Sequence, residues 1–265
     1  MLACKLWDAK DILMNMRTIG LLAVLTLMAA CAPVTRTSFP TETPAPTLTP
    51  TATIVWFPAT NTPTVFPTVE VSPTKDWRPG IGDLLLEDDF SDGENWSLAT
   101  TSNSSVAIAN NRLTLVLSLP QSFLFTTREQ PIFGDFYAEI IASPSLCRRA
   151  DEYGLLVRAA SAQDYYRFSL SCDGQARVDR ILGGVPTSPV PWTKDGAVPT
   201  VAPSTIRLGV WALGDELRFF IGDHYLFSVR DTVFLRGTLG VFVRTAGGTA
   251  VSVSFEELKV WEVAP

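Results

Sequence analysis

The chain has little of what several common kinds of site require. It contains one histidine and four widely spaced cysteines among 265 residues, and these make no zinc ligand set. It also has no Gly-x-Ser-x-Gly nucleophile elbow and no glycine-rich phosphate loop. The sequence therefore argues against a zinc site, an elbow-type hydrolase and a nucleotide-binding loop.

Basic charge is also scarce. Lysine and arginine number 21 against 27 aspartate and glutamate residues, so the formal net charge is −6, with no large block of one sign. A phosphate backbone is bound by a basic stripe. We therefore expect no nucleic acid partner.

Helical periodicity is absent after about the first thirty residues, a span typical of an export signal. Glycine (17) and proline (19) separate short strand-like runs instead. This composition predicts an all-β protein.

The clearest element is Ile206–Val229, which alternates apolar and polar residues with a period of two. A two-residue turn at Gly214-Asp215 pairs Ala212 with Leu217, Val210 with Phe219 and Leu208 with Ile221. For the next turn we expect a three-residue loop, Gly222–His224, which pairs Ile221 with Tyr225, Phe219 with Phe227 and Leu217 with Val229. The prediction is a meander of three antiparallel strands.

An export signal precedes this region. Arg17 is followed by an apolar run, Ile19–Leu27, of nine residues, which is short of the roughly 20 that span a bilayer. Met28-Ala29-Ala30-Cys31 resembles the lipobox of bacterial lipoproteins, which implies lipidation of Cys31 and a membrane anchor on the extracytoplasmic face. The alternatives are a plain secretory signal with an incidental cysteine, and a start of translation at Met14 or Met16.

The domain plan follows from composition. Residues 1–30 are assigned to the signal peptide, and residues 31–82 to a lipidated, Thr/Pro-rich, extended tether, because this segment has too little apolar matter for a core. Residues 83–265 are assigned to one β-sandwich domain, with a long loop at Gly183–Pro203 and a bulge at Glu256-Glu257.

Two cysteines remain after export and lipidation, Cys147 and Cys172, each near the end of a predicted strand. An even number in an oxidising compartment indicates a disulfide. The alternative is two separate buried thiols.

The segments DDFSDGENW, NNRLTL, GDFYAEI, YGLLVRAASAQDYYRFSLSCDGQ, GVWALGDELRFFIGD, GTLGVFV and VSFEELKVWEV occur in this order. Together they resemble the concanavalin A-like lectin/glucanase sandwich, close to its laminin-G-like and 3-keto-disaccharide hydrolase-like branches. The resemblance implies an antiparallel two-sheet jelly roll that binds carbohydrate or protein, with hydrolysis in some members only.

The resemblance does not extend to catalytic residues. Glucanases of this fold carry a Glu-x-Asp-x-x-Glu pattern on one strand, and this chain lacks it. A pair of acids at a strand end points to opposite faces, so neighbouring acids do not replace it. No cofactor is expected, except that a structural calcium ion between the first and last strands would find oxygen ligands in Asp89, Asp92 and Glu256. The alternative is that these are ordinary turn acids.

A ligand site is predicted on the second face of the meander and its neighbouring hairpin. Aromatic rings stack on sugars and guanidinium groups bind hydroxyls or acidic groups. The residues that alternation turns away from the core are Arg158, Tyr165, Arg167, Arg207, Trp211, Arg218 and Phe220. The alternative is that the Gly183–Pro203 loop covers Trp211 and Phe220 and extends the core.

These observations favour a lipid-anchored, non-catalytic binding module for carbohydrate or a cell-envelope partner. Two alternatives remain open, a glycoside-active enzyme of the same fold and a structural envelope protein. Binding of glycan, turnover of a chromogenic glycoside, or neither would separate the three.

The anchor can be tested at one residue. Cys31→Ser removes the thiol that accepts lipid, so we expect the protein to leave the membrane fraction and to lose labelling by fatty-acid analogues. Cell fractionation measures the first effect and in-gel fluorescence the second. A variant that stays in the membrane would instead indicate an uncleaved apolar helix.

Overall fold

The computed structural model describes residues 75–265, and Cys31 with the rest of the predicted signal and most of the tether lies outside them. No helix in residues 75–265 is long and apolar enough to cross a membrane. The described chain is all β, as predicted. Its strands are β1 Ile81–Asp88, β2 Ala99–Thr100, β3 Ser104–Ala109, β4 Arg112–Leu117, β5 Phe123–Thr127, β6 Phe136–Leu146, β7 Arg149–Ser161, β8 Asp164–Cys172, β9 Gln175–Leu182, β10 Val185–Lys194, β11 Ile206–Leu213, β12 Glu216–Ile221, β13 His224–Arg230, β14 Thr238–Arg244 and β15 Val251–Val263.

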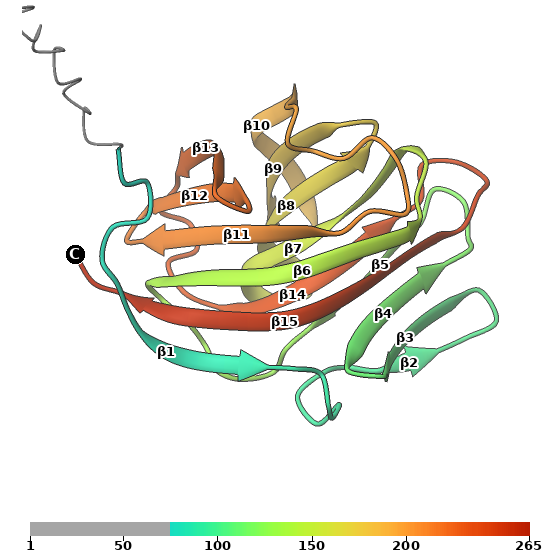
Figure 1. The fold of residues 1–265 in the computed structure, drawn as a ribbon, viewed down its shortest axis with the longest axis horizontal. Coiled ribbons are helices and arrows are strands. Elements are labelled where there is room, and N and C mark those ends of the chain that lie inside the picture. Colours follow the sequence, from blue (N-terminus) through green and yellow to red (C-terminus); the bar gives the residue numbers. More distant parts are fainter. Residues whose placement is uncertain (1–74) are drawn as a thin grey trace, which may run out of the picture. The chain divides into compact units, whose positions relative to one another are not determined.

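These strands form two antiparallel sheets (Figure 1). The nine-stranded sheet has the order β13-β12-β11-β6-β15-β4-β3-β2, with β1 also paired to β15. The six-stranded sheet has the order β10-β9-β8-β7-β14-β5. One continuous apolar core lies between them, built from alternate residues of both sheets. The predicted two-sheet sandwich is therefore confirmed.

The predicted meander is β11-β12-β13. Its first turn is confirmed, because Ala212 pairs with Leu217, Val210 with Phe219 and Leu208 with Ile221. At the second turn the expected pairing of Ile221 with Tyr225 is wrong. Ile221 pairs with His224 across a tight turn, and the extra residue is a bulge inside the strand pair, between Phe219 and Phe220.

Two further expectations concern irregular backbone. The register shifts between Glu256 and Lys259, and Glu257 has a left-handed φ of 52°, so the predicted bulge is confirmed. The prediction that Gly183–Pro203 is a loop is wrong, because this segment contains strand β10. Proline lacks an N–H donor, and β10 tolerates three prolines because it is an edge strand with one side unpaired.

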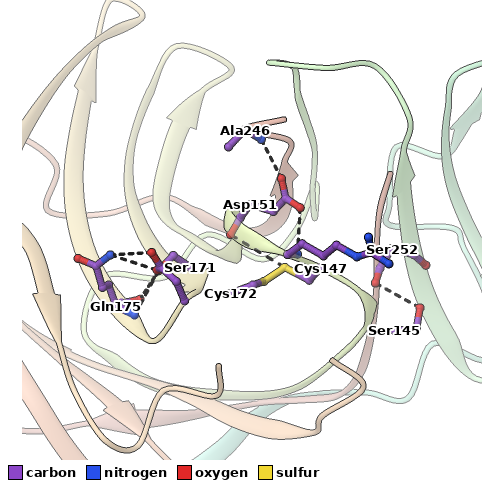
Figure 2. Close-up of a disulfide and its surroundings, with 10 residues drawn as sticks. Ser145, Cys147, Asp151, Ser171, Cys172, Gln175, Ala246 and Ser252 are labelled. Carbon is purple, nitrogen blue, oxygen red and sulfur yellow. Dashed lines mark hydrogen bonds between the residues drawn. A yellow bond between two sulfur atoms is a disulfide. The ribbon is translucent and has the colours of Figure 1, made fainter. Parts of the chain in front are cut away.

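A disulfide joins Cys147, just after β6, to Cys172 at the end of β8, across a sequence separation of 25 residues. Figure 2 shows it beside Asp151 and Ser171. It ties the connection between β6 and β7, which crosses from one sheet to the other, to β8 of the six-stranded sheet. The disulfide inferred from cysteine parity is confirmed.

Removal of this cross-link should destabilise the domain. Cys147→Ala with Cys172→Ala should lower the free energy of unfolding by about 3 kcal/mol, because the unfolded chain regains the entropy of an open loop. Urea unfolding followed by tryptophan fluorescence measures this. Mass spectrometry of the unreduced wild type should find the linked peptide pair, whereas two alkylatable thiols in the native protein would contradict the cross-link.

Candidate functional site

The outer face of the nine-stranded sheet carries an aromatic cluster. Tyr137, Trp211, Phe220 and Val263 are buried there, separate from the core between the sheets. Trp211 and Phe220 thus turn away from the core, as the alternation predicted. Yet only 2% of Trp211 and 1% of Phe220 is exposed.

A short segment of this chain, Lys75–Gly80, covers the cluster; we call it the strap. The indole N–H of Trp211 donates to the carbonyl of Pro79 (2.9 Å), and a guanidinium N–H of Arg218 donates to the carbonyl of Trp77 (2.9 Å). The Trp77 ring stacks on Tyr225 with centroids 4.0 Å apart. The strap was assigned to the tether from its composition, and it is instead packed on the domain.

Charged groups complete the contact. Arg78 donates to the hydroxyl of Tyr137 (2.9 Å) and to the carboxylate of Asp223 (2.7 Å). The Tyr137 hydroxyl in turn donates to Glu139, which also pairs with Arg207 (3.0 Å). Burial, and then the hydrogen bond to Glu139, raises the pKa of Tyr137. This face is occupied by the protein's own residues.

The predicted ligand site does not exist as one surface. Arg207, Trp211, Arg218 and Phe220 lie on the nine-stranded sheet, whereas Tyr165 and Arg167 lie on β8 of the six-stranded sheet. Outer faces of a two-sheet sandwich are on opposite sides of the molecule. Alternation predicts the outward face of these six residues correctly, but it does not show which sheet a hairpin joins.

Arg158 was also expected on the outer face, and this expectation is wrong. It sits at a register shift in β7 with a left-handed φ of 51°, which turns its side chain inward. The guanidinium is fully buried and donates to the carbonyls of Gly214 (2.8 Å), Phe234 (3.2 Å) and Gly134 (2.9 Å). Burial lowers its pKa, opposed by the charge of Asp135. Arg158 therefore joins loops at one end of the sandwich.

The outer face of the six-stranded sheet carries a second polar feature, which we call the arginine–carboxylate layer. Asp179 on β9 pairs with Arg167 (2.7 Å) and Arg177 (3.1 Å), and Arg177 also reaches Glu152 on β7 (3.3 Å). Arg244 on β14 pairs with Glu152 as well. Five charged side chains from four adjacent strands thus form one network.

Aromatic rings flank this layer. Trp192 of β10 lies 4.4 Å from the Arg177 guanidinium, and the Arg167 guanidinium lies over the rings of Phe123 (5.4 Å) and Phe242 (5.7 Å). Tyr165 and Phe125 continue the aromatic side, with ring centroids 6.2 Å apart. Trp192, Phe123 and Phe125 are partly exposed. The face therefore combines guanidinium forks with accessible rings.

The floor of this face contains a polar group without a partner. Ser169 is fully buried, lies opposite Arg177 in the β8–β9 pairing, and its hydroxyl makes no hydrogen bond to the described residues. The Nε of Arg177 is likewise without a partner. A buried polar group without a partner carries a desolvation cost of roughly 1–3 kcal/mol. Such a cost is tolerated where a ligand or water supplies the missing partner.

The layer brings two carboxylates together. Arg177 Nη2 lies 3.3 Å from Glu152 Oε2 and 3.1 Å from Asp179 Oδ2, so the two oxygens are at most the sum of these distances, 6.4 Å, apart. Glycosidase carboxylates are about 5–5.5 Å apart in retaining and about 6.5–9.5 Å apart in inverting enzymes. Both groups here are almost fully buried beneath arginines, so neither is free to contact a glycosidic oxygen.

The three acids considered for calcium are not gathered into a site. Asp89 accepts from the amide of Ser91, Asp92 accepts from the amide of Glu94, and Glu256 pairs with Arg112 (3.2 Å). No group of three or more acids, histidines or cysteines in residues 75–265 is arranged to hold a metal ion.

Sequence reasoning missed five residues of the layer and its rim: Glu152, Arg177, Asp179, Trp192 and Arg244. A signal was present in β9, where Arg177 and Asp179 are two apart and so share a face. This pattern could not predict the ion pairs, because the sequence does not show which strands lie beside β9. Trp192 was hidden by the assignment of its segment to a loop.

No protein-family model matches this chain, and no curated protein matches it either. Solved structures do match. A protein from Bacillus subtilis described as having a galectin-like fold is 13% identical, with a TM-score of 0.54 over 70% of this chain and 99% of that one. A structure described as a native glycosidic hydrolase is 12% identical, with a TM-score of 0.51 over 68% and 96%.

A carbohydrate-binding module from Bacillus subtilis is 17% identical, with a TM-score of 0.49 over 61% of this chain and 95% of that one. At these identities the likeness concerns the fold alone. The domain therefore shares a two-sheet β-sandwich fold with the galectin-like protein and the glycosidic hydrolase structure.

The strap predicts that Trp211 is a packing residue. Trp211→Ala should destabilise the domain by about 3–5 kcal/mol, because it empties a buried site and leaves the Pro79 carbonyl without its donor. Trp192→Ala, at a partly exposed ring, is the matched control and should change the free energy of unfolding by less than about 1 kcal/mol. Urea unfolding compares them, and equal small effects would show that the strap does not seal this face.

Proposed function

We propose that the domain is a non-catalytic carbohydrate-binding module whose glycan lies across the outer face of the six-stranded sheet. The observation that carries the proposal is the arginine–carboxylate layer with its flanking rings. Guanidinium and carboxylate groups hydrogen-bond to vicinal hydroxyls, and a partly exposed tryptophan stacks on the apolar face of a sugar ring. A fixed ionic network also keeps these groups oriented before the ligand arrives.

The other outer face is less suited to this role. The strap already occupies its aromatic cluster and takes the hydrogen bonds of Trp211 and Arg218. A glycan there would first have to displace a packed segment of the chain. The six-stranded face needs no such displacement at Trp192, Phe123 or Arg244.

The setting of this module is part of the proposal. Lipidation of Cys31 would hold the domain at the extracytoplasmic face of a bacterial membrane, with residues 32–74 providing reach. The disulfide supports an oxidising compartment, since such bonds persist outside the cytosol. Glycans or glycosylated envelope components are the partners that fit this location.

A second candidate is glycoside hydrolysis by Glu152 and Asp179, favoured by the short separation of their oxygens. In this reading Arg177 must leave the pair when substrate binds. Turnover of chromogenic glycosides by the wild type, lost in Glu152→Gln and in Asp179→Asn, would establish it. Absence of turnover together with glycan binding assigns the binding role.

The binding role can be tested at Trp192. On a glycan array the wild-type domain, residues 75–265, should be enriched on one class of glycan, and Trp192→Ala should weaken that binding about ten-fold because a stacking platform is lost. Val185→Ala, at an exposed side chain on the same strand, is the control and should bind as the wild type does. The melting temperatures of both variants should match the wild type.

Two results would contradict the proposed binding site or the binding role. If wild type binds no glycan and cleaves none, the result favours the third candidate, a structural envelope protein. If it binds but Trp192→Ala and Arg177→Gln bind equally well, the glycan lies elsewhere on the surface.

A further inference from the structure

One end of the sandwich holds a basic hollow that the proposed glycan face does not include. The β6–β7 and β14–β15 connections enclose about 530 Å³, and the lining includes Arg148, Arg149, Asp151, Gly247, Gly248 and Thr249. A second hollow of about 370 Å³ lies on the other side of the same two arginines, against Cys147 and Cys172. Arg148 and Arg149 therefore line both hollows.

These arginines differ from those of the arginine–carboxylate layer. Arg167, Arg177 and Arg244 are each ion-paired, whereas the exposed side chains of Arg148 and Arg149 make no ion pair or hydrogen bond within residues 75–265. Arg149 also has a left-handed φ of 54°, which costs a non-glycine residue roughly 1 kcal/mol or more. Packing thus explains neither the two unpaired cations nor the strained backbone of Arg149.

Residues with free backbone N–H groups line the same hollow. The amides of Gly247, Gly248 and Thr249 lie outside any strand and donate to no other protein group in the described chain. Free backbone N–H groups are available to donate to an anionic oxygen. Neither glycine has an atom within 4 Å of where a side chain would begin, so a ligand can approach the backbone closely.

The one acid in the lining, Asp151, only partly offsets the positive charge that would attract an anion. Asp151 is 2% exposed, and its two carboxylate oxygens accept from the amides of Arg148 (3.0 Å) and Ala246 (2.9 Å). Figure 2 shows Asp151 directed at Ala246 beside the disulfide. Asp151 thus ties the two loops together, and the lining keeps a net charge of +1. The disulfide fixes the base of the loop, because Cys147 directly precedes Arg148.

We propose that this hollow binds the anionic groups of an acidic polysaccharide, a uronate carboxylate or a sulfate ester. Guanidinium forks and free amides are complementary to both oxyanions. The chain as a whole has a net charge of −6, so a polyanion is repelled unless a local site holds it. The inference rests on the proposed function in one respect, that the polymer is a glycan. The hollow itself is separate from the arginine–carboxylate layer.

The test uses the full chain purified in detergent, with polygalacturonate, dextran sulfate and neutral dextran as probes. Wild type should bind an acidic polymer, more weakly as salt rises because screening reduces the attraction. Arg148→Gln with Arg149→Gln should weaken this binding about ten-fold, and Arg148→Lys with Arg149→Lys should retain part of it. Arg236→Gln is the matched control, since this exposed arginine lies just before β14, at the opposite end of that strand from Ala246.

The outcomes separate the two proposals. Polygalacturonate binding alone indicates uronate, dextran sulfate binding alone indicates sulfate, and both support the site if the double glutamine variant loses them. The Trp192→Ala variant should keep acidic-polymer binding even where it loses neutral glycans. The inference is overturned if wild type binds neither acidic polymer, or if the double glutamine and Arg236→Gln variants bind as wild type does at an unchanged melting temperature.

Discussion

The antiparallel pairing of β15 is the constraint on which the rest of the structure depends. This last strand pairs along one edge with β6 and along the other with β4 and then β1. It therefore joins the first and last parts of the domain at the centre of the nine-stranded sheet. Once β15 has completed the nine-stranded sheet, the inner residues of that sheet face the six-stranded sheet and one continuous core forms. The bulge at Glu256 and Glu257 changes the phase of β15, so that Leu258 and Val260 return to the core face.

The same alternation that fills the core decides what the outer faces carry. On the nine-stranded sheet the outward residues are large aromatics, whose exposure would be costly, and the strap covers them. On the six-stranded sheet the outward residues include Asp179 and Glu152, which are buried but remain paired with arginines, as buried charges must. One face is thus sealed by apolar packing, and the other is organised by ionic contacts whose rim stays accessible. This difference is why the glycan-binding proposal concerns the six-stranded sheet.

The disulfide links structure to the proposed second site. Cys147 and Cys172 hold the end of the molecule at which the β6–β7 and β14–β15 connections meet, and Asp151 bridges those connections through two backbone amides. The loop bearing Arg148 and Arg149 is therefore anchored at its base while its side chains stay exposed. Anchoring the backbone favours binding, because the loop itself then loses little order when a ligand arrives and only the two arginine side chains are immobilised.

Local periodicity and composition were enough to predict part of this structure. They predicted the all-β class, the pairing of Val210 with Phe219, the bulge near Glu256 and, from cysteine parity, the disulfide. Each follows from neighbours along the chain or from counting. Three features could be seen only in the folded chain: which hairpins share a sheet, the inward turn of Arg158 at a bulge, and the covering of Trp211 by the strap rather than by the Gly183–Pro203 segment. Folding alone brought Glu152, Arg177 and Asp179 together. The physical reason is that alternation specifies which face of a strand a residue occupies, whereas the neighbours on that face come from strand pairings between residues distant in the chain.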